Sequence, residues 1–486
     1  MRPVFVFIAL IWLTSLPLLC TGAEALSDFG PLYDQFPLTL APGERTEAAG
    51  PLFSSEHEGT RSSWALSPVM SLERDTGPDS FEFDFFYPLL TYHRFGLDYR
   101  LQFTQLFSVS GGPGIEAAGT KRVSVFPFYF QQRSPDPSEN YTALIPFYGH
   151  LKNRFFRDEI SFVMLPAYVQ TRKKDVVTDN YLVPFFDVRR GDALRGWQFW
   201  PLIGREHKDV TTRTNQYDET EVIGGHDKLF VLWPLFFRND LGVGTTNAQT
   251  QRLLLPFYSI QRSPLRDSTS YLWPLGYTCT EDREKHYREW ALPWPLVDFA
   301  RGEGKTANRV WPLFSQAKTP NLESDFFLWP IYKYNRVHSE ALDRGRTRIL
   351  FFLYSDVIEK NTIAGTSLQR TDLWPLFTAR RDHDGNERLQ LLAPIEPFLP
   401  SHPGIERNYS PLWSFWRSEK NRKTGMARQS FLWNLYRRET TPKSRKCSLL
   451  FGILHYESGI EGTHWRIFHF PLGKSAQPAA PSSGAS

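Results

Sequence analysis

The chain has 486 residues, of which 41% are hydrophobic and 22% are charged, so it can bury a large core. Its 56 basic and 52 acidic residues leave a formal net charge of +4 without a basic stripe or an acidic tail, which argues against a nucleic-acid partner. The unusual feature is an aromatic content of 15%, with 39 Phe and 15 Trp.

The N-terminal segment has the layout of a secretory signal. Arg2 precedes an apolar run from Val4 to Leu19, and small residues follow as far as Ala25. The run is shorter than the roughly 20 residues that span a bilayer as a helix. We therefore expect residues 1–25 to be a cleaved signal peptide and the protein to be exported.

The cysteines add two open questions. Cys20 permits a lipoprotein signal as an alternative, although the bulky Leu19 beside it departs from the small residues usual there. Cys279 and Cys447 could pair in an oxidising compartment, but two cysteines do not make a disulfide framework. We expect two unrelated thiols.

A short apolar unit built around proline recurs along the chain. Its clearest form is Leu-Trp-Pro-Leu-Phe, and one late copy has asparagine in place of proline. Successive prolines from Pro234 to Pro330 are 17 to 22 residues apart, and such a period indicates a repeat architecture. We interpret residues 26–80 as an N-terminal β segment, 81–473 as the repeat domain and 474–486 as a disordered tail. The tryptophans of the repeat are Trp233, Trp273, Trp311, Trp329, Trp374 and Trp433.

Each unit is interpreted as a strand, for example Leu373 to Arg381 with Pro375 at its centre. Between the units, Asp382 to Glu387 and Arg190 to Ala193 have the glycine-containing composition of tight turns, which predicts antiparallel neighbours. A period of about 19 residues then gives roughly 18–20 strands in one long antiparallel meander. No segment after residue 26 shows a sustained helical period.

Both faces of such strands would be apolar at mid-strand, so something must cover each face. The architecture that we favour is a closed β-barrel in the outer membrane of a Gram-negative bacterium. The alternatives are a β-propeller-like repeat, a solenoid or a layered sheet. Proline inside the strands counts against the barrel, because it cannot donate to a ladder of hydrogen bonds.

The usual signatures of catalysis are missing from the sequence, and we expect no enzyme activity, no cofactor and no metal site. A cluster of His455, His464 and His469 is conceivable, but its spacing fits no named metal site. Ordinary, partly buried histidines explain the same pattern.

The expected function is a non-enzymatic outer-membrane barrel or surface scaffold, in one form a channel, with outer-membrane lipid as partner. The alternative is a soluble exported β-repeat protein that binds glycans or protein partners. The six repeat tryptophans are expected to be structural, with contact to membrane or glycan as their further role. The sequence leaves the oligomeric state open.

Overall fold

The computed structural model of the chain describes residues 29–113, 119–214, 218, 220–460, 462–467 and 470–472. The predicted signal peptide, Cys20 and the predicted tail lie outside the described residues. One antiparallel sheet of 43 strands makes up almost all of the described chain, and a separate two-stranded hairpin interrupts it once. The predicted all-β antiparallel meander is therefore confirmed.

The strands are short and follow one another along the chain. The first part of the sheet contains β1 (Tyr33–Pro37), β2 (Glu44–Ala48), β3 (Phe53–Glu58), β4 (Arg61–Leu66), β5 (Met70–Asp75), β6 (Ser80–Phe85), β7 (Leu90–Phe95), β8 (Asp98–Phe103), β9 (Phe107–Gly112), β10 (Thr120–Val125), β11 (Tyr129–Arg133), the 3-10 helix η2 (Pro137–Glu139), β12 (Tyr141–Leu144), β13 (Tyr148–Arg154), β14 (Arg157–Val163) and β15 (Tyr168–Lys173). The middle part contains β16 (Val176–Tyr181), β17 (Phe186–Gly191), β18 (Leu194–Phe199), β19 (Ile203–Lys208), the separate hairpin β20 (Thr211–Thr214) and β21 (Thr220–Ile223), then β22 (Gly225–Val231), β23 (Phe236–Val243), β24 (Gln249–Leu254), β25 (Tyr258–Arg262), β26 (Arg266–Tyr271), β27 (Tyr277–Asp282), β28 (Tyr287–Ala291), β29 (Val297–Gly302) and β30 (Thr306–Val310). The last part contains β31 (Phe314–Thr319), β32 (Leu322–Phe327), β33 (Tyr332–His338), β34 (Leu342–Ile349), β35 (Tyr354–Asn361), β36 (Thr366–Leu373), β37 (Phe377–Arg381), β38 (Glu387–Leu391), α1 (Pro403–Asn408), α2 (Ser410–Trp413), β39 (Trp416–Lys420), β40 (Ala427–Phe431), β41 (Tyr436–Thr440), β42 (Arg445–Leu449), β43 (Leu454–Gly459), β44 (Gly462–Ile467) and β45 (Phe470–Leu472).

The repeat unit is a hairpin rather than a strand, so the prediction of 18–20 strands is wrong. The apolar unit also lies elsewhere than predicted. Leu373 ends β36, Phe377 begins β37, and Pro375 lies in the turn between them. A turn requires no ladder hydrogen bond from the proline nitrogen, which explains why this sheet tolerates proline in nearly every repeat. The two short helices near the C-terminal end were not predicted either.

The turn between β22 and β23 shows how one edge of the sheet is built. The Trp233–Pro234 peptide is cis, and the N–H of Leu235 donates to the carbonyl of Leu232 at 2.7 Å, as in a type VI turn. Neighbouring turns are joined as well, because the Trp233 N–H donates to the carbonyl of Pro201 at 2.7 Å. The hydrogen-bond ladder therefore continues from the strands into the turns.

We call this edge the apolar rim. Its turns comprise residues 86–89, 126–128, 145–147, 164–167, 182–185, 200–202, 232–235, 255–257, 272–276, 292–296, 311–313, 328–331, 350–353, 374–376, 432–435 and 450–453. The opposite edge is made by polar turns. Asp192 and Ala193 join β17 to β18 with positive φ angles of 50° and 55°, and residues 382–386 join β37 to β38 with Gly385 at 82°. These two turns confirm the hairpins that their sequences predict.

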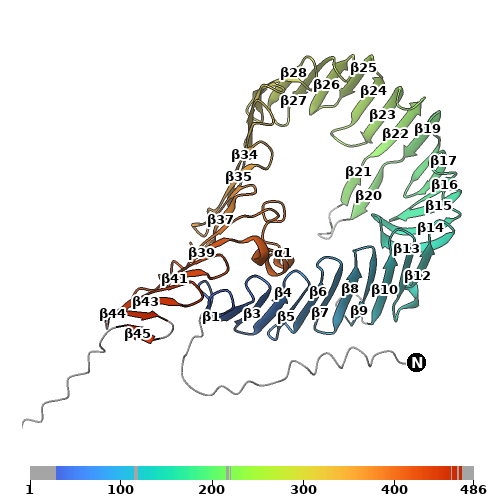
Figure 1. Cartoon of the computed structure of the whole chain (residues 1–486). Helices are drawn as coiled ribbons and strands as arrows, with labels where there is room; N and C mark the ends of the chain where they lie inside the picture. Colours follow the sequence, from blue (N-terminus) through green and yellow to red (C-terminus); the bar gives the residue numbers. More distant parts are fainter. Residues whose placement is uncertain are drawn as a thin grey trace, which may run out of the picture.

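The sheet curves into a ring in which its N-terminal strands meet β39 to β41, and β43 to β45 run on past this meeting point (Figure 1). Strands β1 and β2 lie against β39 to β41 at this meeting point, and α1 lies inside the ring. Among the described residues, no strand pairing joins the two ends, so backbone hydrogen bonds do not close the sheet. A closed barrel in that strict sense therefore stays a prediction.

The two faces of the sheet can be told apart from the contacts of α1. Arg407 of α1 binds Ser71 and Asp84, so these side chains point into the lumen. Side chains alternate along a strand, and the cross-strand register carries the assignment onward, for example from Asp84 to Thr91. We call this the lumen face and the other the outer face. On β6 the outer face carries Phe81 and Phe85.

Because the sheet is a single layer, it has little conventional core. The main buried cluster lies on the lumen face of β11 to β14, where the ring of Phe155 packs over Phe130 with 6.1 Å between centroids. This turn residue folds back from the polar edge and covers the cluster. The buried members are Phe130, Tyr141, Ala143, Leu151 and Phe162.

Candidate functional site

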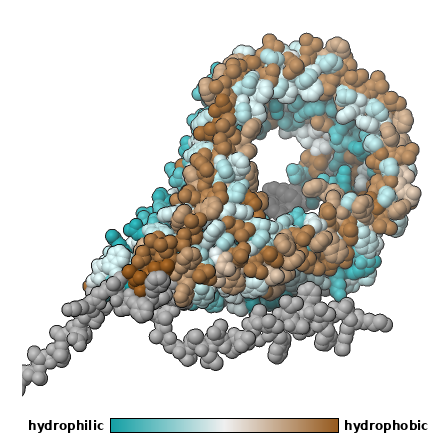
Figure 2. All heavy atoms as spheres, in the orientation of Figure 1, coloured by the Kyte–Doolittle hydropathy of each residue, from teal (hydrophilic) through white to brown (hydrophobic). Residues whose placement is uncertain are grey.

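The apolar rim exposes large hydrophobic side chains to an unusual degree. Leu232, Trp233 and Leu235 of one turn are 51%, 48% and 45% exposed, and the turns on either side repeat the pattern. Figure 2 shows hydrophobic residues gathered along the ring in that view and hydrophilic residues on the visible part of the inner wall. Soluble monomers rarely expose a continuous apolar surface of this extent, and such surfaces mark contacts with protein or membrane.

The tryptophans of the repeat lie in the rim turns, not in the strands where they were predicted. Successive aromatic rings contact each other along the rim: Trp311 and Trp329 have centroids 5.9 Å apart, and Trp329 meets Phe351 edge-on at 5.3 Å. Trp233, Trp273, Trp311 and Trp329 are all at least 38% exposed. These four tryptophans are therefore available to a partner.

Trp374 and Trp433 differ from the other four because the segment between β38 and β39 covers them. The indole N–H of Trp374 donates to the carbonyl of Pro394 at 3.0 Å, and that of Trp433 donates to Pro411 at 2.9 Å. Through these two hydrogen bonds, both side chains anchor the segment between β38 and β39 to the apolar rim.

The outer face is layered from the rim to the polar edge. Many strands place a tyrosine in the first outward position beside the rim turn, and Tyr168 and Tyr181 contact each other there with centroids 5.2 Å apart. Near the opposite edge the outward positions carry ion pairs, such as Arg190 with Asp179 at 2.7 Å. The rim-side tyrosines of the outer face are Tyr129, Tyr148, Tyr168, Tyr181, Tyr258, Tyr271, Tyr277, Tyr332, Tyr354 and Tyr436.

The lumen face is polar along most of its length, and many of its charges are paired. Glu206, for example, accepts from Arg189 at 2.8 Å and from Lys228 at 2.9 Å. Burial alone would raise the pKa of Glu206, but these two cations lower it to about 2. The wall of the lumen is thus a water-compatible surface, in contrast to the rim.

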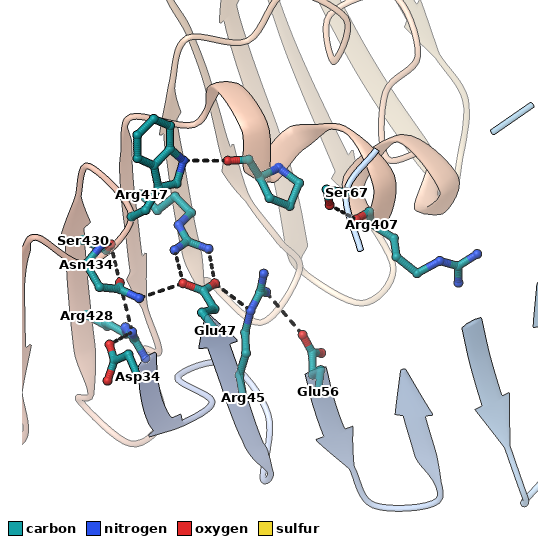
Figure 3. A network of polar contacts seen from close by, with 12 residues as sticks. Asp34, Arg45, Glu47, Glu56, Ser67, Arg407, Arg417, Arg428, Ser430 and Asn434 are labelled. Atoms are coloured by element: carbon teal, nitrogen blue, oxygen red, sulfur yellow. Dashed lines mark hydrogen bonds and ion pairs between the residues drawn. The ribbon is translucent and has the colours of Figure 1, made fainter. Parts of the chain in front are cut away.

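Side chains join the N-terminal end of the sheet to β39 and β41, and we call this contact the clasp (Figure 3). Arg417 of β39 binds both carboxylate oxygens of Glu47 of β2 at 2.6 Å, and Arg45 binds the same carboxylate at 2.9 Å. Burial would raise the pKa of Glu47, but Arg417 and Arg45 hold it well below its usual range. Next to it, Arg437 of β41 pairs with the fully buried Asp34 of β1.

The repeat copy that lacks proline belongs to this clasp. Asn434 occupies the proline position, is 1% exposed, and donates from its amide nitrogen to Glu47 at 2.7 Å. Its own amide oxygen accepts from Ser430 at 2.6 Å. A proline could supply neither bond, so the departure from the repeat has a structural role.

Arg428 is a buried cation of the clasp. It is 7% exposed, lies over the ring of Phe36, and has Asp34 at 3.6 Å. Burial lowers the pKa of Arg428 to about 9, and the nearby Arg437 adds to this effect against the attraction of Asp34.

A second part of the clasp fixes α1 to the wall of β5 and β6. Arg407 is 10% exposed and binds Glu73 at 2.5 Å, Asp84 at 2.7 Å and Glu82 at 3.2 Å. Its Nε donates to Ser71 at 2.9 Å. Four acceptors on two strands therefore hold one guanidinium, and ring closure depends on charge pairing rather than on a strand ladder.

Scans against models of known protein families and against curated proteins find no match for this chain. In the part of the chain that the structure describes, no helix is long and apolar enough to cross a membrane. Cys279 and Cys447 are free thiols on separate strands.

The histidine cluster considered from the sequence is only partly within the described residues. His464 lies opposite Glu457, His455 lies opposite Arg466, and His469 lies outside the described residues. No group of three or more metal-ligating side chains is found among the residues that the structure describes.

Proposed function

We propose that this chain is a non-enzymatic ring scaffold that attaches to a membrane surface by inserting its apolar rim into one leaflet. The observation that carries the proposal is the layering of the molecule. Leucine, phenylalanine and tryptophan occupy the rim turns, tyrosines follow in the first outward row, and ion pairs stand near the other edge.

This order matches the order of environments across one leaflet. Apolar side chains gain roughly 1.5 to 3 kcal/mol each when they leave water, and tyrosine prefers the headgroup level. A penetration of roughly 5–10 Å is typical of proteins that lie in the interface. The rim turns and the tyrosine row together span about this depth, because two residues of a strand advance by roughly 7 Å.

Attachment to one leaflet also agrees better with the strand lengths than a spanning barrel does. Strands that cross a bilayer have roughly 9–11 residues, whereas the strands β1 to β45 have three to eight. The signal-like N-terminal segment makes export part of the proposal, and the Gram-negative outer membrane is the membrane that we propose.

The proposal is tested by flotation of the purified protein with phosphatidylcholine vesicles. Leu235→Asp places a charge in the rim, and Ile363→Asp places the same charge at the polar edge, where Ile363 is 80% exposed. We expect the wild type and Ile363→Asp to float with the vesicles and Leu235→Asp to bind more weakly. Equal binding by the two variants, or recovery of all three proteins without lipid, would refute rim insertion.

A further inference from the structure

The lumen wall contains three cations whose charge is not balanced. Lys333 on β33 and Arg348 on β34 are direct cross-strand partners, and Arg346 is the next lumen-facing residue of β34. Side chains in such partner positions have Cβ atoms roughly 4.5–5.5 Å apart, and like charges there destabilise a sheet. A sequence selected for stability alone would not place them so.

None of the three cations has a carboxylate within 4 Å or a side-chain hydrogen bond among the described residues. Their neighbours differ: Arg344 has Glu359 at 3.7 Å, and Arg370 has Asp372 at 3.0 Å. Asp372 is the carboxylate of the same row, but it already accepts from Arg370 and Thr378. The positive charge is therefore not cancelled by the wall itself.

The polar atoms beside the cations are also unsatisfied. The Nε of Arg346 and the Oδ1 of its cross-strand partner Asn335 are buried without a hydrogen-bond partner. Burial lowers the pKa of Arg346, and the charges of Arg348 and Arg344 add to this effect against the attraction of Asp372. Buried polar groups normally have partners, so the Nε of Arg346 indicates a missing acceptor, whereas the Oδ1 of Asn335 lacks a donor.

The three cations lie close to the apolar rim. Lys333 and Arg348 each lie one residue inside a strand end that adjoins a rim turn, residues 328–331 for β33 and 350–353 for β34. Trp329 and Phe351 of these two turns contact each other and are exposed. A ring that inserts these turns into the acyl layer holds the cations at the level of the lipid phosphates.

We propose that Lys333, Arg346 and Arg348 form a binding site on the lumen wall for the phosphate group of an anionic lipid. The inference rests on the proposed insertion of the rim. Guanidinium groups offer paired N–H donors that match phosphate oxygens, and the lysine adds a point charge. The bound phosphate neutralises the like-charged pair and supplies the acceptor that the Arg346 Nε lacks.

The test compares Arg348→Gln with Arg344→Gln, which removes the same charge from the same strand and face but from a cation that is already paired. Flotation is measured with vesicles of phosphatidylcholine alone and with added phosphatidylglycerol, at constant salt. We expect the wild type and Arg344→Gln to prefer the anionic vesicles. We expect Arg348→Gln to lose roughly fivefold of that preference, because one cation near an anionic surface contributes about 1 kcal/mol.

Thermal unfolding in the absence of lipid distinguishes loss of the site from loss of the fold. Arg348→Gln removes the like-charged partner of Lys333, so we expect its melting temperature to equal or exceed that of the wild type. A lower melting temperature, an equal loss of preference in Arg344→Gln, or no preference in the wild type would overturn the site.

Two further measurements are needed. One distinguishes free phosphate from a lipid as the ligand, and the other distinguishes failure of the phosphate site from failure of rim insertion. Inorganic phosphate that binds the wild type as tightly as the anionic vesicles do would overturn a lipid as the ligand. Absence of binding to any vesicle would refute rim insertion, whereas binding to phosphatidylcholine without preference for phosphatidylglycerol would leave the rim intact and overturn the phosphate site.

Discussion

Neighbouring strands are held together differently at two places in this ring. Between β34 and β35, eight residue pairs stand in register in a regular antiparallel ladder. Between β39 to β41 and β1 to β2, buried side chains make the contact, with Glu47 and Asp34 as the acceptors. A backbone ladder tolerates most side-chain changes, whereas the clasp depends on a few residues. The ring therefore has one specific place at which it can be opened.

The largest loss of stability is expected from Arg407→Ala. This change leaves Asp84, which is 1% exposed, together with Glu73 and Glu82, without their shared cation. Removing one member of a buried ion pair typically costs about 3–5 kcal/mol. We expect the α1 segment to detach from the wall and the radius of gyration to increase in small-angle scattering. An unchanged radius and an unchanged urea midpoint would contradict the role of Arg407 in closure.

A smaller effect is expected from Glu47→Gln. The amide keeps the shape of the side chain but leaves Arg417 without this carboxylate and Arg45 with Glu56 alone, and hydrogen bonds to charged groups contribute about 1.5–3 kcal/mol. Urea unfolding measures the loss. Glu56→Gln on the neighbouring strand is the matched control, because Glu56 is more exposed and, among the described residues, forms an ion pair with Arg45 alone, at 3.3 Å. Equal losses in the two variants would show that Glu47 has no special part in the clasp.

Acid should weaken the clasp over a defined range. A hydrogen bond from His93, and then the charge of Arg407, lower the pKa of Glu82 to about 2 from the ordinary value of 4.5. A lowered carboxylate pKa stabilises the fold at pH above 4.5, and this contribution is lost as the pH falls from 4.5 toward 2.

The unfolding midpoint of the wild type is therefore expected to fall faster with pH over this range than that of Glu82→Gln. If the unfolding midpoints of the two proteins fell in parallel with pH, this would contradict the contribution of Glu82 to stability. His93 acts in the opposite direction: Glu82 raises its pKa above 6.5, so its contribution is complete below pH 6.5 and is lost as the pH rises through the raised value.

The smallest effect is expected on the outer face. Arg190 pairs with Asp179 at 2.7 Å, but the arginine side chain is 70% exposed. The cation is solvated and Asp179 keeps its hydrogen bonds from Tyr168 and Gln170, so Arg190→Ala should change the urea midpoint little. A loss as large as that of Arg407→Ala would show that the clasp has no special place in the stability of the ring.

The meander could be predicted from the sequence because the polar turns carry glycine, as at Gly191 and Gly385, and because each repeat is short. The hairpin nature of the repeat was missed. A run such as Leu373 to Arg381 is apolar whether its centre lies in a strand or in a turn, and periodicity cannot separate the two. The alternation that indicates a strand lies between the prolines, where Phe81, Phe83 and Phe85 alternate with polar residues.

The clasp could not be predicted from the sequence, because it joins residues as far as 403 positions apart, such as Asp34 and Arg437. Local patterns carry no information on such contacts. One signal was nevertheless visible: Asn434 replaces proline in an otherwise regular copy. The helical turns at residues 403–413 were missed because each is shorter than two periods of a helix.

The clasp also bears on how such a ring could change in size. In a barrel closed by backbone pairing, the number of strands and their stagger must agree, so the circumference takes only certain values. Here β2 and β39 meet through Glu47 and Arg417, and the wall between them is a series of similar hairpins. Duplication or deletion of a whole hairpin alters the circumference by two strands and leaves every remaining register intact. Loss of a hairpin is therefore a change in diameter rather than a break in the fold.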